Sequence, residues 1–247
     1  MIQQAVILAG GEGSRLRPIT YEIPKPLVPV QGKAIVTWLV HFFARHGVTD
    51  VLVVIPPKWK HAFEAWREAC LSNLDSSSQV AIELWEEYEP MGTMGALVHH
   101  LRERIGTDPV FVTNGDELKR LDLSTLETFH RQQKNRDPQY AATIALVSVP
   151  NPSDYGVAET EGDRIIKFHE KPAEPPSSYI SSGLYVIEPE VLGEVPRDKT
   201  FLMFEKDLWP RLAISNRLGG CKLDGQWYDC GTLERWEKAI KEWKEPS

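Results

Sequence analysis

Residues 5–18 read AVILAGGEGSRLRP, and this stretch decides the fold of the chain. The apolar run at residues 5–9 predicts a buried strand, which ends abruptly at the glycines of residues 10–13. Glycines at the end of a buried strand let a ligand reach the backbone N–H groups, because no side chains block the approach. Arg15 and Arg17 follow at once, and their forked guanidinium groups suit phosphate oxygens. We therefore predict a polyphosphate-binding loop at the carboxyl end of the first strand of an α/β sheet.

The glycine pattern of this loop differs from two common nucleotide-binding motifs. A dinucleotide-binding fingerprint needs a further glycine where Leu16 stands, and a P-loop needs a Gly-Lys-Ser/Thr sequence that does not follow here. A purely structural turn is the alternative at this point. Lys25 favours a functional site, because it lies close to the arginines and is held extended between Pro24 and Pro26.

The composition of the 247 residues is that of an ordinary globular protein, with 42% hydrophobic and 26% charged residues. This length allows one large α/β domain or two small ones. The sequence shows neither a membrane span nor a signal peptide, and its 3 widely separated cysteines favour neither disulfides nor zinc. Because the net charge is −7, we expect no binding to nucleic acid or to a membrane surface. We expect a cytoplasmic protein.

Strand and helix patterns alternate along the first half of the chain. The predicted strands cover residues 51–55, 80–85 and 109–113, and the predicted helices cover residues 34–46, 59–74 and 97–105. We predict a loop at residues 76–78, and Ser124 with Glu127 forms a capping box that predicts the start of the next helix. Such alternation is typical of a doubly wound, mostly parallel, Rossmann-like sheet flanked by helices.

The second half of the chain has a different pattern, with several short strands and few helices. The predicted strands cover residues 141–149, 157–160, 164–169, 180–187 and 219–223. Residues 161–163 read EGD and predict a hairpin turn, and helices are predicted at residues 204–212 and 233–243. We therefore expect a smaller mixed β region that faces the substrate.

Two further stretches of the first half carry candidate ligand-binding groups. Residues 114–116 read NGD and follow a buried strand, so Asp116 lies where α/β proteins place ligand groups. A carboxylate there suits Mg²⁺, which shares its coordination shell with substrate phosphates; an Asx-turn is the alternative. Gly92 and Gly95 precede a predicted helix whose free N–H groups could bind an anion or a nucleobase, with a plain strand-to-helix turn as the alternative.

With these residues in place, the chain resembles the sugar-1-phosphate nucleotidyltransferases, also called nucleotide-sugar pyrophosphorylases, over nearly its full length. The matching motifs, in order, are LAGGEGSRLRPIT at 8–20, PKP at 24–26, MGTMGAL at 91–97, NGD at 114–116, YGV at 155–157, EKP at 170–172, SSGLYVI at 181–187, FEKD at 204–207 and WYDCGT at 227–232. Several motifs in the correct order are far more specific than the glycine loop alone.

The resemblance implies a GT-A-like fold and a reaction in which an NTP and a sugar 1-phosphate form an NDP-sugar and pyrophosphate with Mg²⁺. It implies that Arg15 holds the triphosphate and the departing pyrophosphate, that Lys25 supports the phosphates and that Lys171 binds the sugar phosphate. Asp116 and Asp229 would hold the Mg²⁺. A sugar phosphate is already ionised at neutral pH, so its attack needs no general base, and positioning together with cations suffices for catalysis.

The resemblance also implies which residues contact the two substrates. Those implied for the nucleotide are Leu8, Ala9, Gly10, Gly11, Gly13, Ser14, Gly92, Thr93 and Gly115. Those implied for the sugar are Tyr155, Gly156, Glu170 and Ser182. Ser182 stands where many family members have asparagine, which affects sugar recognition, whereas Ser14 replaces a common threonine and keeps the hydroxyl group.

The sequence also favours one pair of substrates. Residues 86–93 read EEYEPMGT and resemble the guanylyl-type members, so we expect GTP with mannose 1-phosphate or a related manno-configured sugar such as a heptose. Thymidylyl or uridylyl transfer to glucose 1-phosphate is the alternative. A non-catalytic regulatory subunit is the alternative of another class, although such proteins usually lose the arginine, a lysine or an aspartate that this chain retains. The glycine spacing disfavours a dehydrogenase.

We expect residues 1–247 to form a single nucleotidyltransferase domain. Its nucleotide-binding half would cover residues 1–135, its sugar-binding half residues 136–232, and a C-terminal helix residues 233–247. We expect no left-handed β-helix domain, which some family members carry, and therefore no acetyltransferase activity. We also expect a homo-oligomer, either a dimer or a tetramer.

Overall fold

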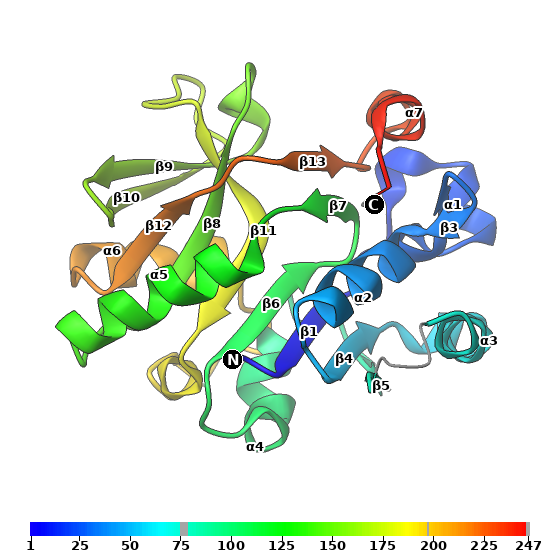
Figure 1. Cartoon of the computed structure of the whole chain (residues 1–247), viewed down its shortest axis with the longest axis horizontal. Coiled ribbons are helices and arrows are strands. Elements are labelled where there is room, and N and C mark those ends of the chain that lie inside the picture. The colour runs from blue at the N-terminus through cyan, green and yellow to red at the C-terminus, as the bar shows by residue number, and fades with distance from the viewer. Residues whose placement is uncertain (75–78, 197, 246–247) are drawn as a thin grey trace.

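The computed structural model describes residues 1–74, 79–196 and 198–245, and the loop predicted at residues 76–78 lies outside them. Across these residues, a central sheet has the strand order β5–β4–β1–β6–β11–β8–β12–β10–β9. Helices cover both of its faces (Figure 1). The predicted α/β class, with a doubly wound sheet between helices, is confirmed.

The predicted strands and helices of both halves are present, with shifted ends. The strands of the central sheet are β1 (Gln4–Leu8), β4 (Asp50–Ile55), β5 (Ala81–Glu86), β6 (Val110–Asn114), β8 (Ala142–Ser148), β9 (Gly156–Glu161), β10 (Arg164–Glu170), β11 (Tyr179–Ile187) and β12 (Leu218–Lys222). The helices are α1 (Ile19–Glu22), α2 (Ile35–Arg45), α3 (Lys60–Ser72), α4 (Arg102–Ile105), α5 (Leu123–Arg136), α6 (Trp209–Ile214) and α7 (Leu233–Glu242). Two ribbons outside this sheet are β2 (Pro29–Val30) with β3 (Lys33–Ala34) and β7 (Glu117–Arg120) with β13 (Gln226–Asp229).

The part of the sheet built from the first half of the chain is parallel. β1 lies between β4 and β6, with Val6 paired to Leu52 on one side and to Val112 on the other. β5 extends the sheet in parallel beyond β4. Because these four strands point in the same direction, the loops that follow them meet at one edge of the sheet. The glycine loop after β1 and the NGD turn after β6 are therefore neighbours.

The second half of the chain continues the same sheet. β11 runs antiparallel to both β6 and β8, and β12 runs parallel to β8. β9 and β10 form the predicted hairpin, with Glu161 paired to Arg164 at its turn. The mixed β region that the sequence predicts is present as an extension of the parallel sheet.

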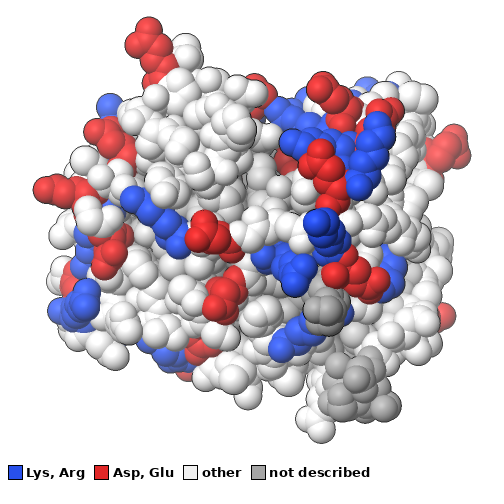
Figure 2. Space-filling view, turned by 45° about the horizontal axis from the view of Figure 1, so that its top comes forward, with Lys and Arg blue, Asp and Glu red and all other residues white. Residues whose placement is uncertain are grey.

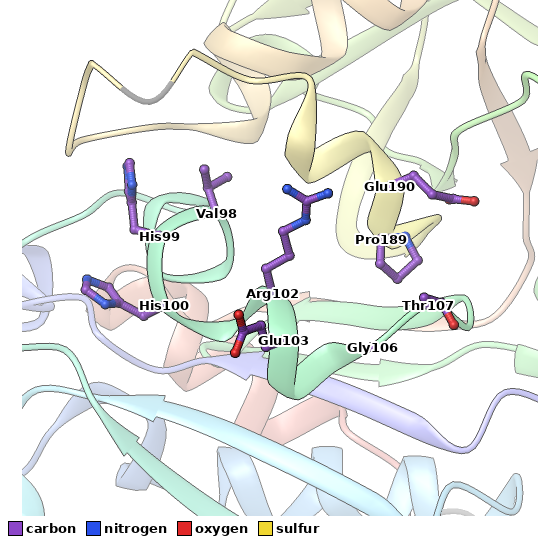
Figure 3. Close-up of a pocket in the computed structure, with 9 residues that line it drawn as sticks. All are labelled: Val98, His99, His100, Arg102, Glu103, Gly106, Thr107, Pro189 and Glu190. Carbon is purple, nitrogen blue, oxygen red and sulfur yellow. The ribbon is translucent and has the colours of Figure 1, made fainter.

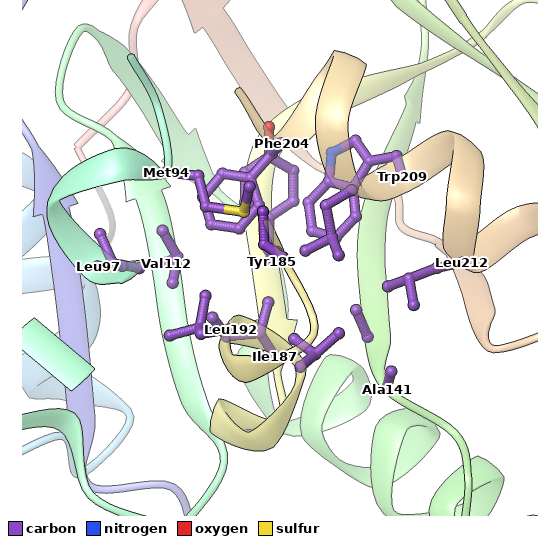
Figure 4. Close-up of a cluster of buried hydrophobic side chains, with 14 of the residues drawn as sticks. Met94, Leu97, Val112, Ala141, Tyr185, Ile187, Leu192, Phe204, Trp209 and Leu212 are labelled. Carbon is purple, nitrogen blue, oxygen red and sulfur yellow. The ribbon is translucent and has the colours of Figure 1, made fainter. Parts of the chain in front are cut away.

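Two apolar clusters fill the space between the sheet and its helices. Figure 4 shows the first, where Phe204 and Trp209 stack with ring centroids 4.9 Å apart and Tyr185 of β11 lies 5.0 Å from Trp209. On the other face, α2, α3 and α5 pack on the sheet, and Phe43 lies 5.8 Å from Phe111. Apolar burial on both faces is the main stabilising contribution to this layered fold.

The C-terminal helix α7 packs beside the β2–β3 ribbon and α2 (Figure 1). The Trp243 ring, just after α7, meets Trp38 of α2 edge-on with centroids 5.7 Å apart. The Trp236 indole N–H donates to the carbonyl oxygen of Pro29 over 2.9 Å. Segments from opposite ends of the sequence are thus packed together.

The capping-box prediction for the helix after residue 122 was wrong. Asp122 is the N-cap of α5, and its Oδ1 accepts the backbone N–H groups of Ser124 at 2.9 Å and Thr125 at 3.2 Å. Glu127 instead accepts the backbone N–H of Ile2 over 3.0 Å. The aspartate caps the helix because it lies one residue before the first helical position, where a side-chain acceptor reaches the free N–H groups.

The surface and the cysteines give three further observations. None of the helices in the described ranges combines the length and apolar character needed to cross a membrane. Figure 2 shows basic and acidic side chains interspersed over the visible face, without a broad patch of one sign. Cys70, Cys221 and Cys230 are free and buried.

Candidate active site

A cavity of about 860 Å³ opens at the edge of the sheet where the parallel strands end. The loops that follow β1, β4, β5 and β6 line it, together with Phe201 and Met203. The lining includes these residues predicted for the nucleotide: Leu8, Ala9, Gly10, Gly11, Gly92 and Thr93. This position at the carboxyl ends of parallel strands is where open α/β sheets bind their ligands.

Two glycines allow the chain to pass close to its neighbours around this cavity. A Cβ atom on Gly10 would lie 2.6 Å from the Oε2 of Glu87. Gly92 has a φ of +76°, and a Cβ atom there would collide with the carbonyl oxygen of Leu202. The Gly92 position therefore requires glycine for both its backbone conformation and the space beside it, whereas a larger residue at Gly10 would displace the Glu87 carboxylate.

Gly13, Ser14 and Gly115, which were also predicted for the nucleotide, lie outside the lining of this cavity. The Gly13 carbonyl accepts the Thr20 hydroxyl over 2.8 Å, and Ser14 begins a short 3₁₀ turn. The backbone N–H of Gly115 donates to the carbonyl oxygen of Leu8 over 2.9 Å. These contacts hold the glycine loop and the NGD turn in place against β1.

A second cavity, of about 210 Å³, adjoins the first on the side of the mixed β region. Its lining includes these predicted residues: Arg15, Asp116, Tyr155, Gly156, Glu170, Lys171 and Asp229. Asn114, Asp116 and Met203 line both cavities. Asp116 therefore lies at the junction of a larger and a smaller cavity, and Lys25 lines the larger one beside it.

Lys25 and Asp116 form a partly buried ion pair at this junction, in which the Asp116 side chain is 34% exposed. Only 6% of Lys25 is exposed, and its Nζ donates to the Oδ2 of Asp116. Burial lowers the pKa of the Lys25 ammonium, but the nearby Asp116 carboxylate outweighs burial, and the net pKa lies above its usual value. Burial raises the pKa of Asp116, whereas Lys25 lowers it further, so that it lies below its usual range. Both groups are therefore charged at neutral pH.

The β7–β13 ribbon brings Asp229 next to Asp116 although the two are far apart in sequence. In this ribbon Asp229 is paired with Glu117, and the backbone N–H of Cys230 donates to the carbonyl oxygen of Asp116 over 3.1 Å. The Arg235 Nη1 donates to the Oδ2 of Asp229 over 2.6 Å. Neither strand of the ribbon was predicted from the sequence, yet the ribbon determines where both carboxylates lie.

Glu117 is a third carboxylate at the junction, but its hydrogen bonds are made within the protein. Its Oε2 accepts hydrogen bonds from the Lys119 ammonium over 2.6 Å and from the Trp227 indole N–H over 3.3 Å. Its Oε1 accepts a hydrogen bond from the Asn114 side-chain amide over 3.2 Å. Burial raises the pKa of Glu117 to about 7, against the opposing charge of Lys119. Glu117 therefore holds the end of β6 and the β7–β13 ribbon together.

The donor set of Asp116 and Asp229 fits Mg²⁺. Within the described ranges, no cluster of three or more His, Cys, Asp or Glu side chains is arranged to hold a metal ion. Mg²⁺ is commonly bound through one or two carboxylates, with waters and substrate phosphates completing its shell. In each aspartate Oδ2 carries the hydrogen bond from Lys25 or Arg235. These hydrogen bonds restrict the orientation of both carboxylates at the junction.

Comparison with known proteins shows the family of this chain. The profile of the Nucleotidyl transferase family matches residues 4–245. The chain belongs to this family. The resemblance inferred from the sequence motifs is thereby confirmed.

Two curated relatives of this nucleotidyl transferase chain are guanylyltransferases by name. The probable mannose-1-phosphate guanylyltransferase 1 of Oryza sativa subsp. japonica is 34% identical over 235 residues, which are 92% of this chain and 61% of that protein. The mannose-1-phosphate guanylyltransferase of Mycobacterium tuberculosis is 34% identical over 237 residues, which are 93% of this chain and 61% of that protein. The chain thus spans about three fifths of the length of these relatives.

Solved structures share the fold of this nucleotidyl transferase chain. A putative glucose-1-phosphate thymidylyltransferase from Bacillus anthracis, in complex with sucrose, has a TM-score of 0.83 and 24% identity, and the match covers 99% of this chain and 97% of that one. HddC from Yersinia pseudotuberculosis has a TM-score of 0.78 and 24% identity, with 98% of this chain and 100% of that one covered. Both likenesses show the same overall architecture.

The structure places Ser182 outside the lining of the smaller cavity. This serine of the nucleotidyl transferase chain is fully buried, and its Oγ donates to the carbonyl oxygen of Ala145 over 2.8 Å. Ser181 and Gly183, its neighbours in β11, line the smaller cavity instead. Successive side chains of a strand point to opposite faces of the sheet, so a residue beside a cavity-lining one faces away from the cavity.

Several cavity residues were missed by the reasoning from sequence. Glu87 lines the larger cavity, and Glu205 and Arg235 line the smaller one. The Oε2 of Glu205 accepts the Thr93 hydroxyl over 2.9 Å, so this bond links the two cavities, and burial raises the pKa of Glu205. Glu87 and Glu205 lie inside motifs that were recognised, whereas nothing in the sequence singles out Arg235.

A separate cavity of about 770 Å³ lies away from this site, beside α4 and the turn at Pro189–Gly193. Figure 3 shows Arg102 extending toward Pro189 and Glu190, with His99, His100 and Glu103 nearby. It shares no lining residue with the two cavities that meet at Asp116. The predicted catalytic and metal-binding residues all lie at those two cavities.

Proposed function

We propose that this chain condenses an NTP with a sugar 1-phosphate to give an NDP-sugar and pyrophosphate, with Mg²⁺. The observation that carries this proposal is the junction of the two cavities, where Asp116 and Asp229 lie among Lys25, Arg15 and Lys171. The larger cavity has room for a nucleotide, and the smaller one has polar side chains that suit sugar hydroxyls. The family and the names of the curated relatives support the same reaction class.

The residues at the junction would catalyse the reaction by position and charge. Backbone of the glycine loop would receive the nucleotide, Arg15 and Lys25 would hold its phosphates, and Lys171 would bind the sugar phosphate. The sugar phosphate oxygen attacks the α-phosphorus in line, so these cations stabilise negative charge as it develops on the transferred and departing phosphates. Mg²⁺ held by Asp116 and Asp229 would supply further Lewis-acid stabilisation. The smaller cavity would orient the sugar through Tyr155, Gly156 and Glu170.

We propose GTP as the nucleotide, because Glu87 offers a carboxylate to a base in the larger cavity. Burial raises the pKa of this carboxyl group against a backbone hydrogen bond from Met91, and the described residues provide no hydrogen-bond partner for its buried Oε1. Guanine presents two adjacent donors, N1–H and the N2 amino group, which a carboxylate can accept together. Uracil and thymine present one donor between two carbonyl oxygens, which would repel the second carboxylate oxygen. The names of the relatives agree with guanine.

Glu87→Gln should therefore lower kcat/KM for GTP while sparing UTP and dTTP. The amide replaces one acceptor oxygen with a donor, and loss of a hydrogen bond that involves a charged group corresponds to about 10- to 100-fold. Glu86→Gln is the control, because Glu86 pairs with Lys60 over 2.6 Å and lines neither cavity. An unchanged ratio of GTP to UTP turnover in Glu87→Gln would remove Glu87 from base recognition.

We propose mannose 1-phosphate or a related manno-configured sugar as the acceptor, on the names of the curated relatives. Pyrophosphate release should be strongest with GTP and such a sugar, and EDTA should abolish it. Signal with dTTP or UTP and glucose 1-phosphate would keep the reaction class and contradict the choice of substrates. If the protein still binds a nucleotide sugar but releases no pyrophosphate with any substrate pair, the result would indicate a regulatory subunit.

We propose that residues 1–247 act as one nucleotidyltransferase domain in the cytoplasm. A homo-oligomer, either a dimer or a tetramer, remains our prediction for its assembly. Light scattering during size-exclusion chromatography measures this mass directly.

A further inference from the structure

Arg235 connects three segments of the chain at the smaller cavity. It lies in the first turn of α7, whose N-cap Thr232 accepts the Arg235 backbone N–H over 3.3 Å. Its Nη1 donates to the Oδ2 of Asp229 on β13 over 2.6 Å, and its Nη2 donates to Asp154. The guanidinium also lies 5.0 Å from the ring centroid of Tyr155. One side chain thus joins α7, β13 and the turn that carries Asp154 and Tyr155.

The contact with Asp229 restricts that carboxylate. Hydrogen bonding in the β7–β13 ribbon fixes the backbone of Asp229 but leaves its side-chain torsions free. The Arg235 bond to Oδ2 restricts these torsions and so holds the carboxylate in one orientation. Carboxylates that bind metals are commonly held by such outer hydrogen bonds, whose loss typically lowers metal affinity or activity about 10- to 100-fold.

The contacts with Asp154 and Tyr155 restrict the sugar side of the same cavity. Asp154, Tyr155 and Gly156 all line it, and the Tyr155 ring packs edge-on against Trp227 with centroids 5.3 Å apart. Arg235 therefore holds this wall at a fixed distance from Asp229. A planar guanidinium can bond two carboxylates at once while it lies over an aromatic ring, whereas a lysine ammonium lacks this geometry.

We propose that Arg235 is a positioning residue that orients Asp229 for the cation and clamps the Asp154–Gly156 wall of the sugar cavity. This inference rests on the proposed function for the identity of the cation and the sugar phosphate. The C-terminal helix α7 thereby contributes to the active site through one side chain. Binding of the cation and binding of the sugar phosphate would both depend on it.

Titration with Mn²⁺, followed by electron paramagnetic resonance of the free ion, tests the first role without nucleotide or sugar. Arg235→Ala should bind Mn²⁺ about 10-fold or more weakly than the wild type. Arg235→Lys should recover most of this affinity, because an ammonium can still donate to Asp229. Unchanged or tighter Mn²⁺ binding in Arg235→Ala would overturn the positioning of Asp229, as would an absence of Mn²⁺ binding by the wild type.

Steady-state kinetics test the second role. Arg235→Ala and Arg235→Lys should both raise KM for the sugar 1-phosphate and leave KM for the NTP unchanged, because alanine has no donor and a lysine ammonium lacks the planar fork that spans both carboxylates. Asp154→Ala removes the acceptor for the Arg235 Nη2, so it should raise the same KM while Mn²⁺ affinity stays at the wild-type value. An unchanged sugar KM in Arg235→Ala, from a wild type that turns over, would overturn the clamp and leave the proposed function standing.

Arg217→Ala provides a matched control for the loss of a partly buried arginine. The side chains of Arg217 and Arg235 are 23% and 24% exposed, and Arg217 also makes two bonds to a carboxylate, that of Glu194. Arg217 lines neither cavity of the site. It should show a similar change in Tm with wild-type Mn²⁺ affinity and sugar KM. If Arg217→Ala also weakened Mn²⁺ binding and raised the sugar KM, the effects of the Arg235 variants would be due to general destabilisation, and the proposal would be overturned.

Discussion

Asp229→Asn is expected to lower Mg²⁺-dependent turnover by about 10³-fold or more, because it removes one of two carboxylates for the cation and Lewis-acid stabilisation contributes several kcal/mol. The fold should persist. The β7–β13 backbone pairing does not involve the side chain, and an asparagine oxygen can still accept the Arg235 hydrogen bond. Pyrophosphate release against Mg²⁺ concentration, together with Tm, checks both expectations.

Asp116→Asn provides an informative contrast. It should abolish turnover as well, but it also replaces the carboxylate that pairs with the buried Lys25 ammonium by a neutral amide. Breaking one side of a fully buried ion pair typically costs about 3–5 kcal/mol, and the cost here should be smaller because Asp116 is 34% exposed. The Tm of Asp116→Asn should therefore fall below that of Asp229→Asn. Wild-type turnover in both variants would refute the assignment of these aspartates to the cation.

Arg15→Ala is expected to lower kcat by about 10²- to 10³-fold, the usual effect of removing one group that stabilises developing charge. Arg15 lines the smaller cavity together with Asp116 and Asp229. In the proposed reaction, its guanidinium would stabilise the negative charge that develops on phosphate oxygens during transfer. Single-turnover measurements at saturating substrates would separate this effect from weaker binding.

Arg17→Ala is the control for this prediction, because it removes the same charge two residues along the loop. Arg17 pairs with Glu12 at 3.5 Å, lies over the Tyr21 ring at 5.1 Å and lines neither cavity. It should retain nearly wild-type turnover. Equal losses in the two variants would mean that the net charge of the loop, and not the position of Arg15, determines the rate.

Much of the fold was predictable because its signals are local. The apolar run before the glycine loop predicted β1, and the alternation of strands with amphipathic helices predicted the parallel half of the sheet. Position at the end of β6 was enough to place Asp116 beside the ligand cavities, because parallel strands end at one edge. These inferences need only the periodicity of hydrophobic residues and the positions of the glycines and prolines that end helices and strands.

The rest depended on contacts between distant segments. β7 and β13 are short and were not recognised, although their pairing brings Asp229 beside Asp116. The face of Ser182 could not be predicted from its motif, because a bulge in β11 changes the register between Ser181 and Tyr185. The sequence around Arg235 contains no motif that marks it as a site residue. Its contacts with Asp229 and Asp154 depend on where α7 packs.

The placement of the β7–β13 ribbon has a consequence for the order in which the protein is made. The glycine loop leaves the ribosome well before Asp229 and Arg235, which lie much later in the sequence. A nascent chain that ends before residue 226 can form the parallel strands and still lacks one of the two carboxylates. The proposed cation site is therefore complete only after β13 has been synthesised and has paired with β7.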